Sequence, residues 1–182
     1  MTERVEEGCD DLVSFLSKLF GSKEPQRPDV KERTVMNIKT GDFITYDLED
    51  FEVVGKLSFN DHGFNWFAYQ LQGNNKVIWL SVEMDDELEL GIYVKSKLKL
   101  QEPLPKKIEL DGVTYFQDEY GTAIVKGEGR SQNVDGAQCR YFSYFDEEDE
   151  KALSLEIWGN EIEASTGYYI EEYELKIIAG SN

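Results

Sequence analysis

The stretch that decides the fold is KVIWLSVE, at residues 76–83. It is rich in β-branched and aromatic residues, and its second half alternates apolar with polar side chains. The stretch LSLEIW at residues 153–158 repeats the same L-S-x-E pattern with an apolar third position. A strand with this alternation has one apolar face to bury, so both stretches predict β-strands packed on one side.

Strand patterns continue on both sides of these two stretches. Turn residues such as Asp61-His62-Gly63 and Gly73-Asn74-Asn75 separate them. No long helical pattern occurs after residue 34, so we expect a mainly β, antiparallel domain of sandwich or barrel-like form. The other predicted strands are Phe43–Tyr46, Phe51–Phe59, Phe64–Gln72, Leu88–Val94, Ile108–Leu110, Val113–Asp118, Gly121–Gly127, Gln138–Phe145, Glu161–Ser165 and Tyr168–Ile178.

The β region consists of two halves with matching sequence. Four short stretches recur in the same order, which predicts a duplicated β-unit with repeats at residues 35–102 and 103–182. Chance similarity between Glu-rich alternating strands is the alternative. Two such half-sheets are expected to bury their apolar faces against each other. The matching stretches are 66–69 with 141–144, 80–83 with 153–156, 87–89 with 161–163, and 91–94 with 167–170.

Residues 1–34 predict an amphipathic helix and a linker that contains Pro25 and Pro28. The helix is expected to dock on the β-domain, on a partner protein or on a membrane. Its first turns are acidic, whereas membrane-surface helices usually carry a basic polar face, so we favour a protein partner or the domain itself. The predicted interaction face comprises Leu12, Phe15, Leu16, Leu19 and Phe20.

The composition of the chain excludes several classes of function. Its 182 residues carry 37 acidic and 19 basic side chains, a net charge of −18. This charge argues against a nucleic acid partner, because phosphate binding needs clustered Lys and Arg. No signal peptide or apolar stretch of membrane-spanning length is present. Cys9 and Cys139 form no disulfide framework, so we expect a cytoplasmic protein without an integral membrane segment.

Several motifs together resemble the bacterial family called domain of unknown function 4178. They are GDFITY at 41–46, FEVVGK at 51–56, W-x-x-Y-x-L at 66–71, WLSVE at 79–83, Y-x-x-Y at 141–144 and L-S-L-E-x-W-G at 153–159. The segment FLSKLFG at 15–21 is similar to the leader often found before this domain. The resemblance assigns no activity and no catalytic residue. It implies a bacterial cytosolic protein that acts beside relatives of phage-shock protein A, a membrane-remodelling coat protein, and so associates with membranes only through a partner.

Two carboxylates are the sharpest candidates for chemistry. Glu83 and Glu156 occupy equivalent repeat positions, and each follows a Ser at the second residue before it. If the halves pack about a pseudo-twofold axis, both side chains can reach one cleft and share acid and base roles. The alternative is that both are solvent-facing strand residues.

The remaining polar motifs favour neither catalysis nor metal binding. His62 is the only histidine, and its turn sequence is typical of a solvated loop. One His and two distant Cys do not make a zinc site, and the acidic runs lack EF-hand spacing. We therefore predict no catalytic residue, metal or cofactor from these motifs.

Aromatic residues are the richest feature of the strands. Most are expected in the core, and some are expected to line a groove for a peptide or a small molecule. The candidates are Trp66, Tyr69, Trp79, Tyr141, Tyr144 and Trp158.

Three hypotheses of function follow from these features. The leading one is a non-enzymatic, cytoplasmic protein-interaction module, and the family resemblance adds a phage-shock-like membrane-stress context. The second is an acidic inhibitor or immunity-type protein that binds a basic enzyme. The third is a small-ligand enzyme that uses Glu83 and Glu156 in a cleft between the repeats.

Overall fold

The computed structural model describes residues 33–180. This part of the chain contains three single-turn 3-10 helices and no α-helix, so the main domain is mainly β as predicted. The 3-10 helices are η1 (Val35–Asn37), η2 (Gln132–Val134) and η3 (Glu172–Glu174). The strands are β1 (Phe43–Tyr46), β2 (Glu49–Asp61), β3 (Phe64–Gln72), β4 (Val77–Met84), β5 (Leu88–Lys95), β6 (Lys107–Leu110), β7 (Val113–Gly129), β8 (Gln138–Phe145), β9 (Lys151–Trp158), β10 (Glu161–Ile170) and β11 (Lys176–Ile178).

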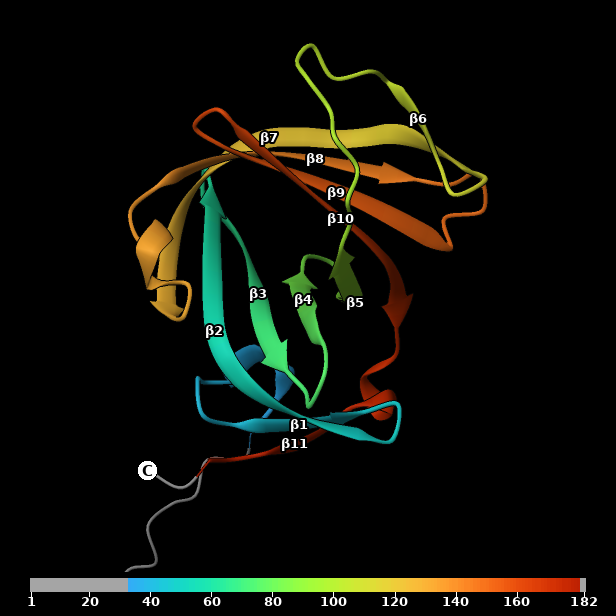
Figure 1. The fold of residues 1–182 in the computed structure, drawn as a ribbon. Coiled ribbons are helices and arrows are strands. Elements are labelled where there is room, and N and C mark those ends of the chain that lie inside the picture. The colour runs from blue at the N-terminus through green and yellow to red at the C-terminus, as the bar shows by residue number, and fades with distance from the viewer. Residues whose placement is uncertain (1–32, 181–182) are drawn as a thin grey trace, which may run out of the picture. The chain divides into compact units, whose positions relative to one another are not determined.

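Eight of these strands close into an antiparallel barrel (Figure 1). The sheet runs β11-β1-β2-β3-β4-β5-β10-β9-β8-β7-β6, and a further pairing of β2 with β7 closes the ring from β2 to β7. The closing seam pairs Leu57 with Gly127 and Phe59 with Val125. Closure leaves the two short outer strands, β6 and β11, at the ends of the sheet, so the long barrel strands have no free edge.

The two halves of the barrel have the same topology. Each half begins with a hairpin, β1–β2 or β6–β7, and continues as an antiparallel meander, β2–β5 or β7–β10. The registers also agree: Trp66 pairs with Glu83 across β3 and β4, and Tyr141 pairs with Glu156 across β8 and β9. Three of the four sequence matches therefore lie at equivalent places in the sheet, whereas the match of 91–94 with 167–170 is shifted by two residues, because the register makes Gly91 equivalent to Ser165. A gene duplication as the origin of the two halves stays a prediction.

Most apolar residues of the two halves face outward, contrary to our expectation, and the halves pack against each other only in a smaller interior cluster of Leu57, Phe59, Ala123, Val125 and Cys139. On β4 the buried residues Leu80 and Val82 point away from the barrel interior and pack with Val35, Ile38 and Ile44 from η1 and β1. Flanking segments cover each apolar face, and they are partly exchanged: Leu175 and Ile177 of the C-terminal segment pack on the first half, and Leu98 and Leu100 pack on the second. The outer core of the second half consists of Ile108, Tyr115, Tyr144, Leu153, Leu155 and Ala164, packed with Leu98, Leu100 and Leu104.

Two predicted strand breaks are absent. Residues 113–129 form one strand with a register shift between Gln117 and Tyr120, and residues 161–170 form another. Gly121 lies against the hydroxyl group of Tyr141, and Gly167 lies against the ring of Tyr93, so at these places glycine makes room for a side chain.

The predicted helix and its interaction face, at residues 5–20, lie outside the described residues. Within residues 33–180, no helix has the length and hydropathy needed to cross a lipid bilayer.

Candidate functional site

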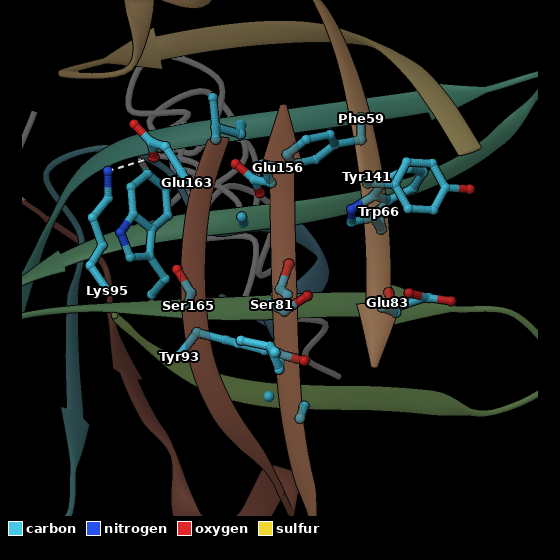
Figure 2. A pocket seen from close by; sticks show the side chains of 18 of the residues that line it. Phe59, Trp66, Ser81, Glu83, Tyr93, Lys95, Tyr141, Glu156, Glu163 and Ser165 are labelled. Atoms are coloured by element: carbon cyan, nitrogen blue, oxygen red, sulfur yellow. Dashed lines mark hydrogen bonds and ion pairs between the residues drawn. The ribbon is translucent and has the colours of Figure 1, made fainter. Parts of the chain in front are cut away.

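The barrel interior contains a cavity of about 770 Å³ that is open to solvent, and all eight barrel strands contribute to its wall. Because successive side chains of a strand point to opposite faces, Trp79, Ser81 and Glu83 of β4 face the cavity, while Leu80 and Val82 face the outer core. The volume lies within the usual range for small-molecule sites. Figure 2 shows Ser81 and Ser165 among the side chains in this interior.

One part of the cavity wall is aromatic. All three tryptophans of the chain, Trp66, Trp79 and Trp158, line it. Trp66 stacks on Phe59 with a centroid distance of 4.8 Å and meets Tyr141 edge to face at 5.0 Å. These contacts restrict the rotation of the Trp66 ring, which therefore lines the cavity in a well-defined orientation.

The cavity is strongly acidic. Eight carboxylate side chains line it against two basic ones. Lys95 Nζ lies 2.6 Å from Glu163 Oε2, whereas Arg130 Nη1 donates to the neutral side chain of Gln72 at 2.9 Å. The carboxylates are Glu83, Glu89, Asp118, Glu119, Asp149, Glu156, Glu161 and Glu163.

The sheet register arranges four of these acids as two cross-strand pairs. Glu83 on β4 lies opposite Glu89 on β5, and Glu156 on β9 lies opposite Glu163 on β10. Like charges directly opposite each other are destabilising. The two pairs occupy equivalent positions in the two halves.

Two of the four carboxyls have strongly raised pKa values. The pKa of Glu83 is raised to about 7, mainly by burial, and the charges of Glu89 and Glu119 add to this rise. Burial also raises the pKa of Glu156 to about 7, and Glu163 adds to this rise, while the hydrogen bond from Trp158 and the charge of Lys95 oppose it. The desolvated carboxyls titrate near neutral pH, whereas an ordinary glutamate is fully ionised there.

The hydrogen bonds of the two acid pairs differ. Trp158 Nε1 donates to Glu156 Oε2 at 3.1 Å, and Glu163 is held by Lys95. Within residues 33–180, the side chains of Glu83 and Glu89 accept no hydrogen bond and form no ion pair. In Figure 2 a dashed line joins Lys95 to Glu163, and none reaches Glu83.

The cavity therefore contains both carboxylates that the sequence singled out, Glu83 and Glu156. They do not act on each other, because the charges that shift Glu83 come from Glu89, Glu119 and Asp85, and those that shift Glu156 come from Glu163 and Lys95. The two carboxyls thus have different charged neighbours.

The predicted interaction aromatics divide into two groups. Trp66, Trp79, Trp158 and Tyr141 line the cavity. The rings of Tyr69 and Tyr144 are fully buried in the outer cores, where their hydroxyls donate to the carbonyl oxygens of Val35 and Pro105. These two tyrosines are core residues that no partner protein can contact.

The remaining candidates show no catalytic arrangement. The side chain of His62 is 96% exposed at the turn between β2 and β3 and pairs with its neighbour Asp61. Cys139 is buried, and burial raises the pKa of its thiol, so it is a packing residue. The described residues contain no group of three or more His, Cys, Asp or Glu that could hold a metal ion.

Sequence reasoning missed three important residues of the cavity, Lys95, Glu89 and Glu163. Glu89 and Glu163 belong to the match of 87–89 with 161–163, and each stands two residues before a position that faces the interior. That periodicity could have identified them. Lys95 has no such signal, because its role depends on the pairing of β5 with β10, which brings distant parts of the chain together.

Comparisons with known proteins identify the family of this chain. A family model described as Domain of unknown function (DUF4178) matches residues 39–172. The chain is 30% identical over 145 residues to Uncharacterized protein Mb2628 of Mycobacterium bovis and to Uncharacterized protein Rv2597 of Mycobacterium tuberculosis, covering 75% of this chain and 69% of each relative. No solved structure matches the chain. The family model and these relatives show that the chain belongs to the family described as Domain of unknown function (DUF4178).

Proposed function

We propose that this protein binds a small organic cation inside the barrel. The observation that carries the proposal is the cavity of about 770 Å³, which combines all three tryptophans with eight carboxylates and two basic side chains. Such a lining suits a ligand that is apolar in its body and positively charged at one or more points.

The aromatic part of the wall supports the apolar and cationic character of the ligand. The faces of tryptophan and tyrosine rings carry negative electrostatic potential, so they attract ammonium groups within about 6 Å of the ring centre. Trp66 and Tyr141 already meet at a fixed angle, so little ordering is needed when a ligand binds.

The carboxylates support the charge of the ligand. A cavity lined by one sign of charge raises the local concentration of the opposite ion and speeds its entry. An anionic ligand would instead meet eight carboxylates against two basic side chains, one of which, Lys95, is already paired with Glu163. The chemistry therefore favours cations over acids, phosphates and nucleotides.

The other two hypotheses from the sequence concern the outer surface and residues 1–34. An interaction module with a membrane-stress context and an acidic inhibitor both stay predictions. The cavity favours a ligand between the halves, which was part of the third hypothesis, but in a binding role. The different charged neighbours of Glu83 and Glu156 argue against a catalytic pair.

Titration of the full-length chain tests the proposal. Because every tryptophan of the chain lines the cavity, intrinsic fluorescence reports directly on occupancy. We expect n-butylammonium, tetramethylammonium and 1,4-diaminobutane at pH 8 to give saturable fluorescence changes and binding heats. Added salt should weaken all three, because the attraction is electrostatic.

Butyrate is the matched control, since it has the chain length of n-butylammonium and the opposite charge. We expect it to bind at least about tenfold more weakly than the amine, the result of charge selection. Equal responses to butyrate and n-butylammonium, or no saturable response to any of the cations, would contradict the proposal.

A further inference from the structure

We propose that an alkylammonium group of the ligand is held between Glu83 and Glu89, at the place equivalent to the one where the acid pair of the second half, Glu156 and Glu163, is joined by the ammonium group of Lys95 from β5. This inference rests on the proposed function and deepens it, because it assigns the ligand's charged end to one subsite and names a primary amine as its chemistry.

The equivalence of the two subsites follows from the sheet register, which pairs Glu83 with Glu89 as it pairs Glu156 with Glu163. Beside the Glu156–Glu163 pair, Lys95 of β5 pairs with Ser165, which stands two residues after Glu163 on β10. Beside the Glu83–Glu89 pair, Tyr169 of β10 pairs with Gly91, which stands two residues after Glu89 on β5. The pseudo-twofold relation thus places Tyr169 beside Glu89 as Lys95 is placed beside Glu163.

The occupants of these equivalent places differ in charge. Lys95 Nζ reaches Glu163 Oε2 at 2.6 Å, so the second acid pair contains a cation supplied by the protein. Tyr169 is neutral and stacks on Phe145, with ring centroids 5.8 Å apart. Burial is the main cause of the raised pKa of the Tyr169 hydroxyl, and Tyr93, Glu89 and Glu83 add to it.

The first acid pair therefore lacks the cation that its counterpart has. Glu83 has only carboxylates for charged neighbours, namely Glu89, Glu119 and Asp85. A buried or half-buried carboxylate is stable only when it is paired or protonated. The chain itself shows which group fits such a pair, since the occupant of the equivalent site is the end of a four-carbon amine.

The surroundings of the first pair also suit an alkyl chain. Glu83 lies directly across from Trp66 on β3, and Tyr93 and Gly91 line the same part of the cavity. Gly91 stands where the second half has Ser165, and the ring of Tyr93 lies over it, so this part of the wall is aromatic. The ammonium end can therefore lie between the carboxylates while the methylene groups lie along the aromatic rings.

Matched variants of the full-length chain test the assignment with n-butylammonium as the probe. We expect Glu83→Gln to weaken its binding by about tenfold or more, because a charged hydrogen bond is lost. Glu163→Gln is the control at the equivalent position and should leave the affinity within about threefold, because Glu163 already holds Lys95. Circular dichroism spectra and melting temperatures show that both variants are folded.

Lys95→Met supplies a second and independent readout. Removing the ammonium group of Lys95 should leave Glu156 and Glu163 without a cation and so make this pair available to the ligand. Equilibrium dialysis with labelled n-butylamine at saturation should then count two bound amines per chain, where the wild type binds one. A count that stays at one would overturn the inference.

The outcomes separate the inference from the proposed function. If n-butylammonium binds the wild type but Glu83→Gln and Glu163→Gln weaken it equally, the subsite assignment is wrong while cation binding stands. If n-butylammonium fails to bind the wild type at all, the proposed function fails, and the inference fails with it.

Discussion

The double variant Glu83→Gln/Glu156→Gln is expected to be more stable than the wild type at pH 8, by about 2 kcal/mol in the free energy of unfolding. Both carboxyls are held in the cavity wall with pKa values raised to about 7, from an ordinary value of 4.5. An amide of nearly the same shape has no charge to desolvate, so the substitution removes a cost and keeps the packing. The figure includes a discount of more than half for the partial solvent exposure of these side chains.

The sign of the pH dependence follows from the raised pKa values. The folded protein binds protons on Glu83 and Glu156 more tightly than the unfolded chain does. Wild-type stability contributed by these groups is therefore present below about pH 4.5 and is lost as the pH rises toward 7. The advantage of the double variant should be largest at pH 8 and should shrink to less than about 1 kcal/mol at pH 5. Urea unfolding curves at the two pH values measure both quantities.

A control variant separates this effect from a general loss of negative charge. Glu147→Gln/Glu148→Gln removes the same charge from exposed positions in the turn between β8 and β9, and it should change stability by less than about 0.5 kcal/mol. A double variant at Glu83 and Glu156 that is less stable than the wild type at pH 8 would show that the two carboxylates make favourable contacts. Acids that lower stability and remain in the wall of a cavity are typical of a functional site.

Local patterns in the sequence were sufficient to predict most of the strands. Phe43–Tyr46, Phe64–Gln72 and Gln138–Phe145 have the predicted bounds, because period-two alternation and turn residues are properties of neighbouring residues. Closure of the barrel was not predictable in the same way. The seam between β2 and β7 joins residues about seventy positions apart, and no local pattern distinguishes this pairing from an open sandwich.

The larger error of the prediction was which face of each strand points into the barrel. Alternation showed correctly that Leu80 and Val82 share one face and that Ser81 and Glu83 share the other. It could not show that the apolar face points outward, because this depends on the short segments at residues 35–46, 96–110 and 175–178 that cover it. The same limit applies to the site: Glu83 and Glu156 were recognised by repeat position, but Lys95 becomes significant only through its contact with Glu163.

The second large effect is expected at the two outer cores. Leu80→Ala and Leu153→Ala should each lower the free energy of unfolding by about 3 kcal/mol, the middle of the range for a leucine truncated in a fully buried site. The two residues are fully buried and occupy equivalent positions, opposite the buried Tyr69 and Tyr144. Val94→Ala is the control on an exposed part of β5, where the side chain is 47% accessible, and should cost less than about 1 kcal/mol.

These two variants also show whether the halves are independent domains. Their outer cores share no residue, but Leu175 and Ile177 of the second half pack on the first core, and Leu98 and Leu100 of the first half pack on the second. The barrel couples them, because β5 pairs with β10 at one junction and β2 pairs with β7 at the other, so loss of either half leaves two long edges unpaired. We therefore expect one cooperative urea transition for Leu80→Ala and for Leu153→Ala, with coincident curves from far-ultraviolet circular dichroism and tryptophan fluorescence. A separate early transition in Leu153→Ala, with the fluorescence of Trp66 and Trp79 still native, would show that the first half folds without the second and that the cavity is an interface between two domains.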